Sequence, residues 1–161
     1  MSCGPYREAA QERTRGDGRM VVKRGYVPNR QWRIEIDAIP PAEIRGNARA
    51  HPIVAGKTKR KWREEGEVMV IHDGVFHDSD LGLEKVKITF TFHHWRHIDL
   101  DNLTIGMKAW VDGLVDAGLI SNDTPDKVTY GEHQFVKVKK DQSKTEVLIE
   151  ELCMASDTIP A

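Results

Sequence analysis

Two aspartates, Asp99 and Asp101, lie two residues apart where an alternating apolar stretch gives way to a helical pattern. In an extended chain, residues two apart point the same way, so both carboxylates would share one sheet edge. The N-terminus of the following helix favours negative charge there. A third aspartate, Asp123, comes in the loop after that helix. Carboxylates without Cys or His favour Mg²⁺, with Mn²⁺ as a substitute, so we predict that Asp99, Asp101 and Asp123 hold such an ion.

This prediction depends on the path of the chain after the helix. A helix of roughly 15 residues is about 22 Å long, so Asp123 must return toward Asp99 through the following loop. The alternative is a capping aspartate followed by solvated loop aspartates, because Asp is common at caps and turns.

The elements that would position these residues follow from hydrophobic periodicity. Alternation predicts strands at 32–39, 83–95, 128–140 and 145–152, the last two forming an antiparallel hairpin. A helix is expected from about 52 to 72. A second, with Asp101 or Asn102 as its N-cap, should end at Gly118. Its core-facing stripe is Leu103, Met107, Trp110, Val111 and Leu114.

The order β-α-β-α-β-β predicts an α+β fold, in which two main helices pack on a single mixed sheet of about four strands. We expect a flexible N-terminal arm at 1–30, a domain at 31–154 and a flexible tail at 155–161. No apolar run approaches the roughly 20 residues that span a bilayer, so no membrane partner is expected. The polar N-terminus lacks a signal-peptide core, which favours a cytoplasmic protein.

Charge is divided unevenly along the chain. Residues 1–97 carry 18 basic against 13 acidic side chains, and residues 98–161 carry 6 against 12. Cations to hold phosphates and carboxylates to hold metal would suit a protein that cuts phosphodiesters. The candidate DNA-binding residues are Lys57, Lys59, Arg60, Lys61, Arg63 and Arg96. The alternative for the cluster at 57–63, which has equal weight, is a solvated charged helix that also carries Glu64 and Glu65.

Three histidines, His93, His94 and His97, raise the question of zinc. Adjacent residues of a strand point to opposite faces and no cysteine is near, so zinc is disfavoured. A surface role or a contact with phosphate is the preferred interpretation.

The helix and its flanks resemble the Holliday junction resolvases of the RusA type. The resemblance covers roughly 32–152 and is densest over 98–128. It includes the turn at Pro40-Pro41 and a final strand hairpin. The matching motifs are Asp99-Leu100-Asp101-Asn102-Leu103, Lys108-Ala109, Asp112-Gly113-Leu114, Ala117-Gly118 and Asn122-Asp123. Two departures stand out: three extra residues, 104–106, precede the lysine segment, and Asn122 replaces the first acid of the family's loop pair.

The resemblance implies a Mg²⁺-dependent homodimer that resolves four-way DNA junctions by paired phosphodiester hydrolysis, in recombination or repair and in a phage or prophage setting. Lys108 would stabilise charge on the phosphate or the leaving oxygen. Asn102 would cap the helix or orient a carboxylate. Asp112, four residues after Lys108, is interpreted as its ion-pair partner on the helix surface.

Two other functions remain open. One is a non-catalytic protein of the same fold that binds branched DNA, with Asn122 as the trace of a lost site. The other is a metal-dependent phosphoesterase acting on small phosphates. The basic segment and the lack of a nucleotide-binding Gly-rich loop argue mildly against the phosphoesterase.

Overall fold

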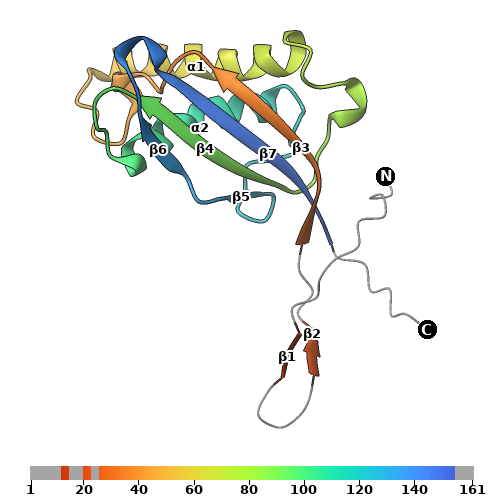
Figure 1. Ribbon diagram of the computed structural model, residues 1–161. Coiled ribbons are helices and arrows are strands. Elements are labelled where there is room, and N and C mark those ends of the chain that lie inside the picture. Colours follow the sequence, from red (N-terminus) through yellow and green to blue (C-terminus); the bar gives the residue numbers. More distant parts are fainter. Residues whose placement is uncertain (1–11, 15–19, 23–25, 155–161) are drawn as a thin grey trace.

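The computed structural model describes residues 12–14, 20–22 and 26–154, with side chains from 30 to 153. A five-stranded sheet forms the centre, and both helices lie on one side of it (Figure 1). Its strands are β3 (Tyr26–Ile36), β4 (Val86–His94), β5 (Val128–Tyr130), β6 (Gln134–Lys137) and β7 (Lys144–Met154). The helices are α1 (Pro52–His72) and α2 (Leu100–Asp116). The α+β class with a mixed sheet and two main helices is therefore confirmed.

The sheet order is β3-β7-β4, and β5 and β6 share the outer edge of β4. β7 runs antiparallel to both β3 and β4, whereas β5 and β6 run parallel to β4. The predicted hairpin between the last two strands is therefore wrong. β4 lies between β6 and β7, and the short turn η3 (Lys140–Gln142) carries the chain across the end of β4. The hydrophobic pattern located the strands, except that the one expected at 128–140 is divided into β5 and β6. The pairing was decided by which neighbours bury β4.

Side chains of β4 alternate between the core and the open face of the sheet. Val86, Ile88, Phe90 and Phe92 are fully buried under the helices. The five predicted core residues of α2 are also buried, each at most 1% exposed. Gly118, with φ +80°, ends α2 as predicted, because a residue without Cβ adopts the left-handed conformation at little cost.

The two helices cross at two glycines. A Cβ on Gly66 of α1 would lie 2.3 Å from the carbonyl oxygen of Trp110, and a Cβ on Gly113 of α2 would lie 2.1 Å from that of Arg63. The missing side chains let the backbones approach, and α2 packs closely beside α1 on the same side of the sheet.

The first strand is longer than predicted, since β3 begins at Tyr26 and not at Trp32. Within the segment expected to be a flexible arm, β1 (Glu12–Thr14) and β2 (Met20–Val22) pair antiparallel. The rest of 1–25 and the expected tail at 155–161 lie outside the described residues. Two further short turns are η1 (Ala42–Ile44) and η2 (Asp78–Asp80).

Candidate functional site

The chain turns back at once after α2. Beyond Gly118, the buried residues Leu119 and Ile120 run beside 82–83, with a 2.8 Å hydrogen bond from the Leu83 nitrogen to the Leu119 oxygen. This anchoring directs the following loop along the flank of α2. Asp123 consequently reaches the middle of the helix, where Lys108 lies.

Three charged side chains meet there. Lys108 Nζ donates a 3.0 Å hydrogen bond to Asp123 Oδ2 and lies 3.9 Å from Asp112 Oδ1. The hydrogen bond to Asp123, with the charge of Asp112, raises the pKa of Lys108, and the same bond lowers the pKa of Asp123. Burial, with the nearby charge of Asp123, raises the pKa of Asp112 even though Lys108 opposes this. We call Lys108, Asp112 and Asp123 the Lys108 cluster.

The predicted trio of aspartates does not come together. Asp99 is the N-cap of α2, and its Oδ1 lies 3.5 Å from His97 Nε2 at the surface. Asp101 is exposed in the first turn, about 16 Å along the helix axis from Asp112. Within residues 30–153, no three His, Cys, Asp or Glu side chains are grouped to hold a metal ion. Asp123 does return to α2, but it reaches the middle of the helix and not its N-terminus.

The helix nevertheless aligns several of these groups. Residues seven and eleven positions apart lie on the same side of an α-helix, so Asp101, Lys108 and Asp112 form one stripe along α2. Ile105, 58% exposed, lies between the first two. Asp101 and Lys108 are exposed and Asp112 is half-buried, so an extended ligand reaches the stripe mainly at its first two charges.

The two predicted asparagines have local roles. Asn102 lies inside the first turn and is not the cap, a position that Asp99 takes without a side-chain hydrogen bond. The Asn102 carbonyl oxygen accepts a 3.2 Å hydrogen bond from the Gly46 nitrogen. Asn122 Oδ1 accepts a 2.8 Å hydrogen bond from the Asp123 nitrogen, which fixes the turn that presents Asp123.

Sequence reasoning missed Tyr130, which is 47% exposed in β5. Burial of its hydroxyl raises its pKa, and the charges of Lys108, Asp123 and Asp112 all act on it. Tyr130 therefore borders the Lys108 cluster from the sheet side. Only the parallel pairing of β5 with β4 brings it there, so no local pattern pointed to it.

The basic residues of α1 are exposed, but they are not equally free to bind. Arg63 holds Asp116 with both its Nε and its Nη2, the second at 2.7 Å, and this contact raises the pKa of Arg63. For the other four, no ion pair is found within the described part of the chain: Lys57, Lys59, Arg60 and Lys61. Arg96 lies beyond β4, with its guanidinium carbon 4.1 Å from the centroid of the Trp95 ring.

The three histidines turn to different partners. His93 Nε2 lies 3.4 Å from Glu146 Oε2, too poorly aligned for a hydrogen bond, and His94 Nδ1 lies 2.8 Å from Ser143 Oγ. His97 faces Asp99.

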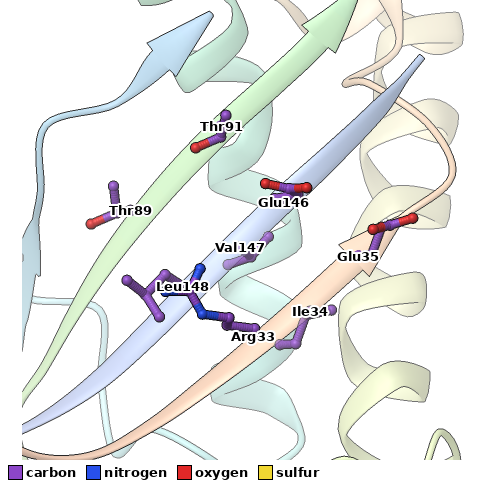
Figure 2. Close-up of a pocket in the computed structure, with 8 residues that line it drawn as sticks. All are labelled: Arg33, Ile34, Glu35, Thr89, Thr91, Glu146, Val147 and Leu148. Atoms are coloured by element: carbon purple, nitrogen blue, oxygen red, sulfur yellow. The ribbon is translucent and has the colours of Figure 1, made fainter. Parts of the chain in front are cut away.

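A shallow hollow of about 320 Å³ lies on the face of the sheet that the helices leave open. Figure 2 shows residues of β3, β7 and β4 around it, including Arg33, Glu35, Thr89, Thr91 and Glu146. The hollow lies across the sheet from α2 and is separate from the Lys108 cluster.

Neither a scan of the chain against protein-family models nor a search of curated proteins found a match. Among the described residues, neither helix combines the length and apolar character needed to cross a membrane.

Proposed function

We propose that this protein is a divalent-metal-dependent endonuclease that cuts branched DNA. The observation that carries the proposal is the return of Asp123 to α2, where its carboxylate meets Lys108 and Asp112. Two carboxylates beside an ammonium group, at a position that solvent reaches, suit a substrate whose phosphates complete the binding of a metal ion.

The donor set supports a hard divalent cation at the Lys108 cluster. Asp112 and Asp123 both approach Lys108 Nζ, and the charge of Asp123 raises the pKa of Asp112, so the two carboxylates together favour a cation. Mg²⁺ is commonly bound by one or two carboxylates, the remaining ligands being water and substrate phosphates. Asp112 and Asp123 would hold it. Asp101 and Asp99, about 16 Å away at the start of the same helix, would meet the bound DNA and not this ion.

Bound there, the cation would polarise a phosphoryl oxygen and make water a better nucleophile. In the hydrolysis, the water oxygen bonds to phosphorus, the bond from phosphorus to one deoxyribose oxygen breaks, and that oxygen takes a proton. Lys108, whose raised pKa keeps it charged, would stabilise negative charge on the phosphate. Tyr130 would donate a hydrogen bond to the DNA from the sheet side.

The preference for four-way junctions and the homodimer rest on the resemblance to the RusA-type resolvases. A dimer with two cutting sites at fixed spacing would select a junction by its shape and flexibility. On α1, the exposed residues Lys57, Lys59, Arg60 and Lys61 would hold phosphates. Arg63 would join them only by giving up Asp116.

The proposal is tested by incubating the protein with a labelled four-way junction in Mg²⁺ and in a chelator. We expect Mg²⁺-dependent nicks at symmetric positions. Asp123→Asn and Asp112→Asn should each slow cutting by roughly a hundredfold or more. Asp126→Asn, in the same loop but facing solvent, is the matched control and should cut normally.

One observation favours a second candidate, a non-catalytic protein that binds branched DNA. The three aspartates expected to share a metal do not converge, and Asn122 occupies the position of a fourth acid. Retention of the junction without cutting, equally in Mg²⁺ and in chelator, would support this binder and reject the nuclease.

A further inference from the structure

The end of β4 carries a tryptophan outside the core. Trp62 and Trp110 are 4% and 1% exposed, whereas Trp95, in the bend after β4, is only half-buried. Two cations flank its ring. The Arg96 guanidinium carbon lies 4.1 Å and Lys140 Nζ 5.4 Å from the ring centroid. The ring of Trp95 is thus partly open to solvent and bordered by charged side chains, with the ring of His94 6.0 Å away.

The chain brings further lysines to the same place. Lys137 of β6 is paired in register with His94, and the Val138 nitrogen donates a 3.1 Å hydrogen bond to the His94 oxygen. The following turn, η3, begins at Lys140 and adds Lys139 just before it. We call this surface the Trp95 patch, and its members are Trp95, Arg96, Lys137, Lys139 and Lys140.

The charges of the Trp95 patch are not neutralised locally. Within residues 30–153, none of its four cations forms an ion pair, unlike Arg63 or Lys144, which do. Asp141, in η3, is the acid next to it in the chain. The pKa of neighbouring His94 is lowered by burial and by the positive charges of Arg45 and Arg96, as expected where cations outnumber acids.

We propose that the Trp95 patch binds an unpaired DNA strand, with one base stacked on Trp95 and the adjacent phosphates held by Arg96 and the lysines. This inference rests on the proposed function, because branched DNA that opens at its crossover offers such a strand. Aromatic rings interleaved with cations are the usual means of holding single strands. Bases inside a duplex are already stacked, so Trp95 selects the unpaired strand. Asp99 and Asp101 begin four residues further along, which places the bound strand beside the acids of α2.

The test measures binding of a fluorescent oligothymidine and of a duplex of equal length, in chelator, over a range of salt. Trp95→Ala should weaken binding of the single strand by between roughly fivefold and a hundredfold, and Trp95→Phe should restore most of it. Arg96→Gln with Lys140→Gln should flatten the salt dependence by about 1.4 in slope, the value for two single-strand phosphate contacts.

Arg33→Gln with Lys127→Gln is the matched control, because it removes the same charge from β3 and from the start of β5. It should leave the slope unchanged. The inference is overturned if Trp95→Ala binds the single strand like the unaltered protein, or if the two double variants change the slope equally. Binding in chelator does not depend on cutting, so failure of the nuclease proposal and failure of the Trp95 patch are distinguishable.

Discussion

Lys108 and Asp123, 15 residues apart in the chain, are joined by a 3.0 Å hydrogen bond between Nζ and Oδ2. The lysine is largely exposed and projects from the middle of α2, whereas the aspartate approaches from the loop beyond Gly118. This ion pair ties the loop to the helix and places a second carboxylate against Asp112. The ammonium therefore takes the position at which a metal ion or a phosphate would meet the acids.

Replacing Lys108 by methionine should increase the affinity of the free protein for Mn²⁺, by up to about fivefold. Methionine keeps the bulk of the side chain but leaves Asp112 and Asp123 without a counter-charge, so a divalent ion has no ammonium to displace. Isothermal titration with Mn²⁺ in the absence of DNA measures this. Lys127→Met is the control for charge alone. Weaker Mn²⁺ binding by Lys108→Met would mean that the ion does not bind at the Lys108 cluster.

Asp101→Asn should slow cutting and leave junction binding intact or tighter. The substitution removes a carboxylate that would meet the substrate about 16 Å along α2 from Asp112, and with it a negative charge that repels phosphate, while asparagine keeps the size of the side chain. Cleavage rate and junction affinity are measured together, with Asp78→Asn, an exposed aspartate of η2, as the control. Full cleavage by Asp101→Asn would confine the site to the middle of α2.

Stability should fall as the pH drops below about 6.5, the ordinary pKa of histidine. His133 Nδ1 accepts a 3.0 Å hydrogen bond from the Phe90 nitrogen, and burial lowers the pKa of His133. The pKa of His94 is lowered as well. The unfolded chain then binds more protons than the folded one, so this stabilisation is complete above the unfolded pKa and is lost as the pH falls through the folded pKa values.

Melting temperatures at pH 7.5 and 5.5 test the pH dependence. His133→Asn is the most informative variant, because the asparagine amide oxygen can accept the hydrogen bond from the Phe90 nitrogen but does not titrate. We expect a smaller loss of melting temperature on acidification than in the unaltered protein. An equal loss would assign the effect to other groups.

Gly66→Ala and Gly113→Ala should each destabilise the fold by about 1–3 kcal/mol or more, because the new Cβ would meet carbonyl oxygens that belong to packed backbone. Gly56→Ala, in the same helix as Gly66, meets nothing within 4 Å and should stabilise by up to about 1 kcal/mol through helix propensity. Urea midpoints decide between the two signs. An unchanged urea midpoint for Gly66→Ala would show that the two helices are less closely packed at their crossing than in this structure.

Elements with strong local signals were predictable. The structure buries the residues that the sequence pattern predicted to face the core. They are the apolar stripe of α2 and the alternating residues Val86, Ile88, Phe90 and Phe92. Sheet pairing was not predictable in the same way. β6 and β7 are consecutive and both alternate, which favours a hairpin, yet each pairs with β4 on opposite sides. Local pattern specifies which face of a strand is buried but not which strand lies beside it.

The candidate site was likewise only partly predictable. The pairing of Lys108 with Asp112 follows from helical spacing, whereas the expected convergence of Asp123 with Asp99 and Asp101 was wrong. Asn122 in the turn was also visible, although its hydrogen bond to the Asp123 nitrogen was not. Tyr130 and the Trp95 patch were missed, because they are assembled from segments that approach one another only through β4.

By itself, the sequence determined which segments are helix and strand, which of their faces are apolar, and that α2 is flanked by acids at both ends. Only the tertiary structure decided where Asp123 comes to rest. The buried residues Leu119 and Ile120 anchor the loop beside 82–83 and direct the carboxylate to Lys108 and not to the start of α2. Burial of Leu119 and Ile120 against residues much earlier in the chain fixes the path of the loop. The free energy of this burial exceeds the contribution of one exposed ion pair such as that of Lys108 with Asp123.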